Sequence, residues 1–95
     1  MKTYVILVRF SPEAFRDPKD LKKTMELLFA RIRSDCPEVV WKDSYSTLGR
    51  YDVIDIVESD YPEQVEKAAM LIRAYGHATT ETLPAKPFRE LLANL

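Results

Sequence analysis

The fold is decided at residues 39–58, VVWKDSYSTLGRYDVIDIVE. Alternating apolar and polar positions over 39–48 predict an amphipathic strand, with Val39, Trp41 and Tyr45 on one face. Gly49 and Arg50 predict a two-residue turn of type II′, in which glycine takes the first central position. Residues 51–58 then form the returning strand, which carries apolar side chains on both faces. Such a strand is covered on both sides, so we expect it at the centre of a sheet.

The segments outside this hairpin predict two further strands. Residues 3–10, TYVILVRF, are again apolar on both faces and predict a second central strand. Residues 77–85, HATTETLPA, are rich in threonine and mixed in polarity, which is typical of an edge strand. The sheet is therefore expected to have four strands.

Two amphipathic helices and a short terminal helix complete the pattern. Asp17 and Pro18 predict the start of the first helix, and Cys36 before Pro37 predicts its end. Its apolar stripe is Leu21, Met25, Leu28, Phe29 and Ile32. The second helix starts at Tyr61 and Pro62 and ends at Gly76. Its expected buried face is Val65, Ala68, Ala69, Ile72 and Tyr75. Pro87 opens the terminal helix, which carries Phe88, Leu91 and Leu92.

The predicted order is β-α-β-β-α-β followed by a short C-terminal helix. This α+β order is the ferredoxin-like pattern, a single antiparallel sheet with strands 3–10 and 51–58 at its centre. Two helices cover only one face of such a sheet, and the central strands leave a second apolar face exposed. A second copy of the chain, packed sheet to sheet, is the simplest cover. We expect one domain over residues 1–95, whose partner is another copy of itself.

Charge and composition exclude several classes of function. The net charge is −1, with 14 lysines and arginines against 15 aspartates and glutamates. The three lysines at 19, 22 and 23 alternate with acidic residues, so the chain has no basic stripe for nucleic acid. The single cysteine, Cys36, suits a reducing compartment and is interpreted as a small buried hydrophobe. No signal-peptide pattern or apolar span of ~20 residues occurs, so we expect a cytoplasmic protein without a membrane partner.

The segment Leu48–Asp52 resembles the signature of the GYD-domain proteins, a group of small bacterial and archaeal proteins. The group is named for a glycine, one intervening residue and Tyr-Asp, here Gly49, Tyr51 and Asp52. Similar segments are Tyr4–Val8, Asp52-Val53 with Ile56–Glu58, and Arg73–Leu83. The resemblance implies a dimeric α/β-barrel assembly. The wider group includes cofactor-free monooxygenases, haem enzymes, small-molecule-binding regulatory domains and muconolactone isomerase-like enzymes, so the fold does not select a function.

Three residues are candidates for acid–base chemistry. His77 is the only histidine, the side chain that titrates nearest pH 7. The alternative is a strand-end residue in contact with solvent. A hairpin centred on Gly49-Arg50 sets Asp43 near Ile56 and Asp55 near Ser44. If the two carboxylates shared a face, the pKa of one would rise and provide a proton acceptor. Otherwise each is solvated or paired, and Arg9 is the expected partner of Asp55.

The ligand-binding candidates are Arg9, Trp41, Tyr45, Tyr51 and Asp55, which place aromatic and charged groups on an otherwise apolar sheet. The alternative is that the aromatic residues belong to the core or an interface. Asp52 is expected to bond turn amides while Tyr51 packs over the hairpin. There is no Cys/His cluster, calcium-spaced loop or glycine-rich phosphate loop, so no metal or cofactor is predicted.

Three classes of function follow from these residues. The first is a small-molecule-binding module with its ligand at the sheet or at the dimer interface. The second is a cofactor-independent enzyme of the monooxygenase or isomerase type, which needs His77 or a strand carboxylate in a closed pocket. The third is a structural assembly module without a site.

Overall fold

A computed structural model describes all residues from Met1 to Leu95. The elements are β1 (Lys2–Phe10), α1 (Pro18–Asp35), β2 (Val40–Ser46), β3 (Val53–Ser59), α2 (Pro62–Gly76), β4 (Ala78–Ala85) and α3 (Phe88–Ala93). The four strands form one sheet in the order β2-β3-β1-β4, and every neighbouring pair is antiparallel. This arrangement confirms the ferredoxin-like prediction, including the central positions of β1 and β3.

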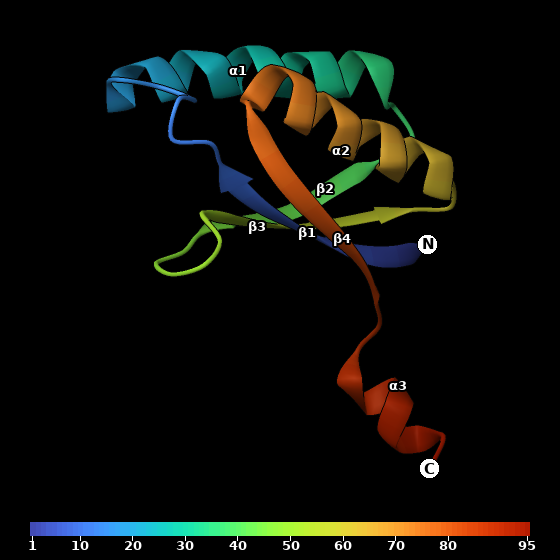
Figure 1. Cartoon of the computed structure of the whole chain (residues 1–95). Helices are drawn as coiled ribbons and strands as arrows, with labels where there is room; N and C mark the ends of the chain where they lie inside the picture. Colours follow the sequence, from blue (N-terminus) through green and yellow to red (C-terminus); the bar gives the residue numbers. More distant parts are fainter.

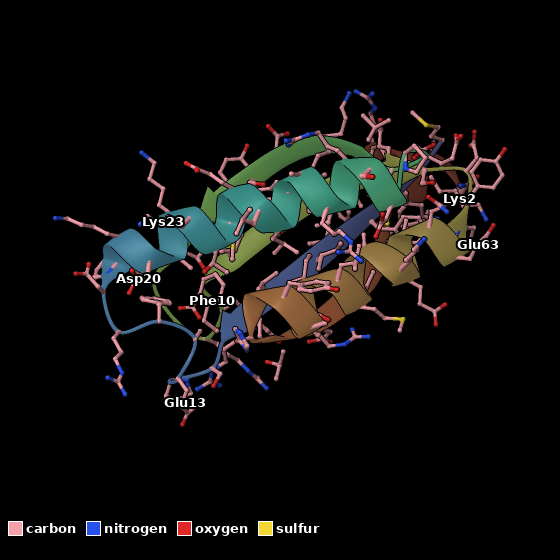
Figure 2. All side chains as sticks on the ribbon, turned by 90° about the horizontal axis from the view of Figure 1, so that it is seen from above. Lys2, Phe10, Glu13, Asp20, Lys23 and Glu63 are labelled. Carbon is pink, nitrogen blue, oxygen red and sulfur yellow. The ribbon has the colours of Figure 1, made fainter.

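Both long helices lie on the same side of the sheet (Figure 1). Seen from above, α1 and α2 run side by side along it (Figure 2). Alternation along β1 buries Tyr4, Ile6 and Val8 beneath the helices, so Val5 and Leu7 point to the other side. No element of the chain covers that other side, which we call the open face. The helix α3 projects away from the body on the same side as the open face (Figure 1).

The two helices approach the sheet differently. The backbone of α2 lies close to β1, β3 and β4, whereas α1 comes close only to α2. Small residues explain the first contact, because Ala68 and Ala69 are buried and let α2 sit directly on the strands. The sheet-facing side of α1 carries the bulky Met25 and Phe29, which are only half-buried. These side chains hold α1 away from the sheet and leave a space beneath it.

The hairpin confirms the predicted register but not the predicted turn. Asp43 lies opposite Ile56, and Ser44 lies opposite Asp55, as expected. The strands stop short, however, at Ser46 and Val53. The amide of Thr47 donates to the carbonyl of Asp52 at 3.0 Å, which leaves a loop over 48–51 instead of a two-residue turn. Within this loop Gly49 has a φ of 140°, a conformation that favours glycine.

A bulge corrects the predicted faces of β2. The register shifts between Trp41 and Asp43, because Lys42 is an extra residue on this strand. Trp41 lies opposite the buried Val57 and therefore faces the helices. Tyr45 lies opposite Ile54 and faces the open side. The two aromatic residues, predicted to share a face, are thus on opposite sides of the sheet.

The helix α2 ends at Gly76 as predicted, but the left-handed residue lies one position later. Gly76 is the last helical residue, and the left-handed residue that ends the helix is His77, with φ 49° and ψ 56°. Gly76 itself is buried beside α1, where a Cβ would lie 3.4 Å from the Leu28 side chain, an ordinary van der Waals contact. Tyr75 is not part of the buried face. It is 47% exposed, and the guanidinium of Arg31 lies 5.1 Å from its ring centre.

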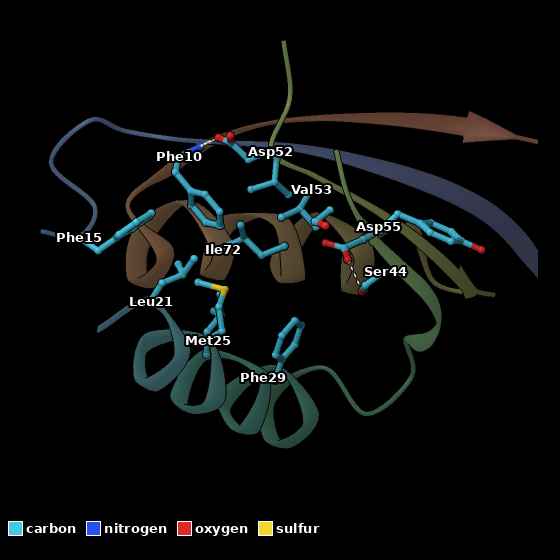
Figure 3. Close-up of a pocket in the computed structure, with 14 residues that line it drawn as sticks. Phe10, Phe15, Leu21, Met25, Phe29, Ser44, Asp52, Val53, Asp55 and Ile72 are labelled. Carbon is cyan, nitrogen blue, oxygen red and sulfur yellow. Dashed lines mark hydrogen bonds between the residues drawn. The ribbon is translucent and has the colours of Figure 1, made fainter. Parts of the chain in front are cut away.

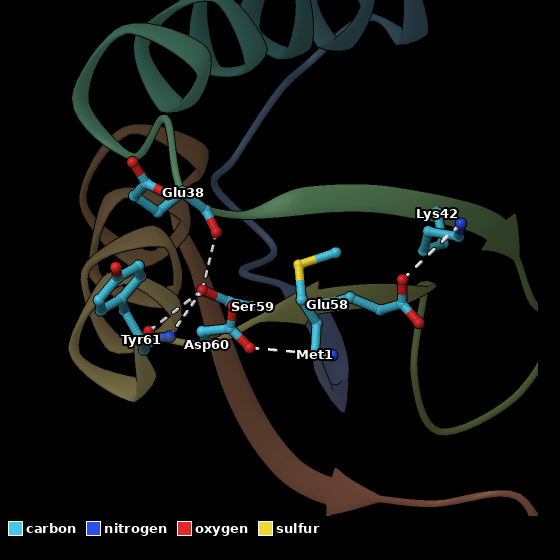
Figure 4. A network of polar contacts seen from close by, with 7 residues as sticks. All are labelled: Met1, Glu38, Lys42, Glu58, Ser59, Asp60 and Tyr61. Carbon is cyan, nitrogen blue, oxygen red and sulfur yellow. Dashed lines mark hydrogen bonds and ion pairs between the residues drawn. The ribbon is translucent and has the colours of Figure 1, made fainter.

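A polar network closes the end of the sheet where β3 meets α2 (Figure 4). The fully buried hydroxyl of Ser59 donates to the carbonyl of Glu38 at 2.7 Å and accepts from the amide of Tyr61 at 3.0 Å. These bonds tie the segment before β2 to the start of α2.

Candidate functional site

A cavity of about 430 Å³ lies between α1 and the sheet (Figure 3). Its wall is mostly apolar: Val8, Phe10, Phe15, Leu21, Met25, Leu28, Phe29, Val53 and Ile72. The remaining lining residues are Tyr45 and four smaller polar ones, Ser44, Ser46, Asp52 and Asp55. Its volume is in the range of small-molecule sites, which are apolar with a few placed polar groups.

The stand-off of α1 produces this cavity. Leu21, Met25 and Phe29 project toward the sheet but remain half-buried. The Trp41 ring of β2 meets Phe29 edge to face, with ring centres 6.0 Å apart, and the space beside this pair is left open. The facing positions on β2 are Ser44 and Ser46, two small residues on an exposed edge strand. Small residues opposite large ones leave both a gap and an opening at the sheet edge. The cavity therefore follows from side-chain sizes on the two elements.

Asp55 is the buried polar group of the cavity. It sits on the central strand β3 and is only 3% exposed. Its Oδ1 accepts two hydrogen bonds from β2, at 2.5 Å from the Ser44 hydroxyl and at 3.1 Å from the Trp41 indole nitrogen. Desolvation by burial raises the pKa of this carboxyl above its ordinary value, although the two hydrogen bonds oppose the effect. Asp55 therefore has the perturbed environment that is common at functional sites.

Asp52 also lines the cavity, and its role is largely structural. Its Oδ2 accepts from the amide of Phe10 at 2.8 Å, and its own amide donates to the carbonyl of Val8 at 2.8 Å. The residue thus continues the pairing of β1 and β3 beyond the last rung of the ladder. It bonds the neighbouring strand and not the turn amides that the sequence suggested.

Tyr51 lies on the open face. Its hydroxyl donates to Glu81 on β4 at 2.7 Å, and this bond is the main cause that raises the pKa of the phenol. The guanidinium of Arg50 lies 5.8 Å from the Tyr51 ring centre. Tyr51 and Asp52 are neighbours in the GYD signature, yet their side chains serve opposite sides of the sheet.

The structure divides the five predicted ligand-binding residues into two groups. Trp41 and Asp55 are on the helix side, whereas Arg9, Tyr45 and Tyr51 belong to the open face. Tyr45 also contributes to the cavity lining, because it lies between Ser44 and Ser46 at the cavity edge. The expected pairing of Arg9 with Asp55 is wrong. Ile6 is the β1 residue opposite Asp55, and Arg9 is on the other face of its strand. Ser44 and the aromatic lining of the cavity were missed, because their sequence pattern is that of ordinary strand and core residues.

The other acid–base candidates lie outside the cavity. His77 and Asp43 are both exposed, and neither lines it. No group of three or more histidine, cysteine or acidic side chains comes together in a way that could hold a metal ion. None of the helices is long and apolar enough to cross a membrane.

Comparison with protein families gives one assignment. The family model of the GYD domain matches residues 4–94. The chain belongs to the GYD-domain family. This result confirms the resemblance seen in Gly49, Tyr51 and Asp52. A comparison with curated proteins finds no match.

Solved structures share the fold of this GYD-domain protein. The leucine response regulatory protein LrpA of Mycobacterium tuberculosis aligns with a TM-score of 0.60 at 16% identity, over 90% of this chain and 51% of LrpA. The chain therefore spans about half the length of LrpA. FFRP-DM1 aligns with a TM-score of 0.59 at 30% identity, over 90% of this chain and 100% of that one. The hypothetical protein PHS023 from Pyrococcus horikoshii aligns with a TM-score of 0.57 at 28% identity, over 92% of each chain.

Proposed function

We propose that this GYD-domain protein is a small-molecule-binding module that pairs with a second copy of itself. The ligand occupies the cavity between α1 and the sheet. One observation carries the proposal: an apolar cavity of about 430 Å³ has the buried carboxylate of Asp55 in its wall. A core with no other task would be filled by side chains, because empty apolar space costs stability.

A ligand would complete the surroundings of α1. The half-buried Met25 and Phe29 would gain contacts that the sheet does not provide. Entry at the β2 edge, beside Ser44 and Ser46, requires no opening of the core. LrpA, which shares this fold, is named a leucine response regulatory protein, and leucine is a small molecule. At 16% identity that relationship shows a shared fold alone, and the proposal rests on the cavity and on Asp55.

Self-association is proposed from the open face. Its central positions are Val5 and Leu7 on β1 and Ile54 and Ile56 on β3, and no segment of the chain covers them. Uncovered apolar patches of this kind mark interfaces. The terminal helix α3 is a second uncovered apolar surface, because none of its residues is buried, and Phe88 is 70% exposed. A second copy facing the sheet would cover the central strands and provide a surface for α3.

Native mass spectrometry of freshly purified protein tests both parts. We expect an integer multiple of the 11.0 kDa chain plus a residual mass that is lost on denaturation. The variant Ser46→Trp places a large side chain at the cavity opening and is expected to remove the residual mass. Ser34→Trp, on the exposed surface of α1, is the matched control and should retain it. Ligand binding would be contradicted if wild-type protein carried no residual mass and also bound none of three small probes, phenylpropylamine, phenylpropanol and phenylpropanoate.

A further inference from the structure

We propose that the cavity takes a monocationic amine with an apolar body, and that the ammonium group pairs with Asp55. This inference rests on the proposed function and names the chemical class of its ligand. It follows from three features of the site: the sign of the charges in the cavity wall, the unused oxygen of Asp55, and the aromatic lining.

The charged groups of the wall are of one sign. Asp52 and Asp55 are the only charged side chains that line the cavity, and no lysine, arginine or histidine lines it. A negatively charged ligand would meet two carboxylates and no cation, which disfavours it. A neutral ligand would leave the buried carboxylate without a counter-charge. A cation is the ligand that the wall complements.

Asp55 has an open position for such a cation. Both hydrogen bonds from β2 go to Oδ1, and no protein group bonds Oδ2. Figure 3 shows the carboxylate at the cavity wall, with one oxygen turned toward Ser44. None of the ion pairs of the structure includes Asp55. A buried carboxylate without a charged partner is costly, and an ammonium donor at Oδ2 would lower that cost.

Arg33, which lines a neighbouring hollow, does not fill this role. A shallow hollow beyond Phe29 is lined by Arg33, Val39 and Trp41, and it shares Ser44 with the cavity. Arg33 forms no ion pair with Asp55, and its charge is not among the causes that shift the pKa of this carboxyl. The chain itself therefore places no counter-charge beside Asp55.

The lining also suits the rest of the ligand. Phe10 and Phe15 meet edge to face, with ring centres 6.0 Å apart, and Phe29 faces them across the cavity (Figure 3). Aromatic rings favour both an apolar body and a nearby ammonium group. An alkyl or arylalkyl primary amine combines these features in one molecule.

Isothermal titration calorimetry with three matched probes tests the proposal: phenylpropylamine, phenylpropanol and phenylpropanoate. They share one apolar body and differ only in the charge of the head group. We expect the amine to bind at least about tenfold more tightly than the alcohol, and the carboxylate to bind most weakly. The comparison uses wild-type protein, so it does not depend on whether any variant folds.

Two variants assign the preference to one residue. Asp55→Asn keeps an acceptor for Ser44 and Trp41 but removes the charge, and it should abolish the preference for the amine. Asp43→Asn removes an exposed carboxylate from the open face one position away, and it should retain the preference. Suppose that the amine and the alcohol bind wild-type protein with equal affinity and that Ser46→Trp prevents both from binding. This result would overturn the ligand class and leave the proposed function intact. Failure of all three probes to bind would overturn the ligand class, and together with the absence of a residual mass in native mass spectrometry it would overturn the proposed function too.

Discussion

The hydroxyl of Ser44 lies 2.5 Å from Oδ1 of Asp55, across a rung that joins the edge strand β2 to the central strand β3. This contact orients a carboxylate inside the helix-covered side of the sheet, where its strand neighbours Val57 and Ser59 are fully buried. The bond uses one carboxylate oxygen and leaves the other at the cavity. Asp55 therefore contributes both to the pairing of β2 with β3 and to the polar surface of the cavity.

The stability of the protein should depend on the protonation of Asp55. Burial raises the pKa of this carboxyl in the folded state above its ordinary value of 3.8, so the folded protein holds the proton more tightly than the unfolded chain. The contribution is fully present below the ordinary value and is lost as the pH rises through the folded-state pKa. We expect Asp55→Asn, which cannot ionise, to be more stable than wild type by about 1 kcal/mol near neutral pH. Urea unfolding across the acidic to neutral range measures this difference.

The same experiment has a matched control. Asp43→Asn removes an exposed carboxylate from the neighbouring rung and should change the free energy of unfolding by less than about 0.5 kcal/mol at any pH. The advantage of Asp55→Asn should also shrink toward acidic pH, where the wild-type carboxyl is protonated. A constant difference at every pH would show that ionisation of Asp55 does not limit stability.

Asp52→Ala should destabilise the fold by about 1–2 kcal/mol, because the amide of Phe10 would lose its acceptor. Asp52→Asn retains an oxygen acceptor and should therefore destabilise the fold less than Asp52→Ala does. Hydrogen exchange at the Phe10 amide gives the local readout, with faster exchange in the alanine variant than in the asparagine variant. Equal exchange in both variants and in wild type would mean that this bond does not hold the end of β1.

Ile56→Asp should disrupt self-association. Ile56 lies at the centre of the open face, where an ionised side chain would be buried against a second copy. We expect the dissociation constant to rise at least about tenfold, with an unchanged circular dichroism spectrum. Leu27→Asp alters a leucine that is 74% exposed on the outer side of α1 and should not change the mass in solution. Sedimentation equilibrium measures both, and an Ile56→Asp protein that still associates would exclude the open face as the interface.

His77 should matter through its backbone rather than its ring. Its left-handed conformation is strained for most residues and most unfavourable for β-branched ones. We expect His77→Val to cost about 1 kcal/mol of stability, whereas His77→Gly should be at least as stable as wild type. Thermal unfolding of the two variants provides the comparison. Equal losses in both would indicate that the imidazole itself makes a stabilising contact.

The sequence predicts the strand order and the hairpin register well, for physical reasons. Apolar residues on both faces of β1 and β3 identify central strands, and the pairing of Ser44 with Asp55 follows from counting outward from the loop. The faces of β2 could not be predicted, because the bulge at Lys42 has no local sequence signal. Beyond the bulge, the β2 side chains point to the opposite face from the one predicted relative to Trp41, so Trp41 and Tyr45 lie on opposite sides of the sheet.

The cavity could not be predicted either. It depends on the distance between α1 and the sheet, which is set by Met25 and Phe29 on one side and by two serines on the other. A periodic apolar stripe looks the same whether its partner strand fills the space or leaves it open. For this reason the sequence identifies Asp55 as unusual in its strand but not what the carboxylate faces.

A crystal structure of the protein with phenylpropylamine would locate the bound amine. We expect the aromatic ring to lie between α1 and the sheet, in contact with Phe29, and the ammonium nitrogen to lie within hydrogen-bond distance of Oδ2 of Asp55. A cavity closed by collapse of Met25 and Phe29 onto the sheet, or an amine bound only on the open face, would contradict this expectation.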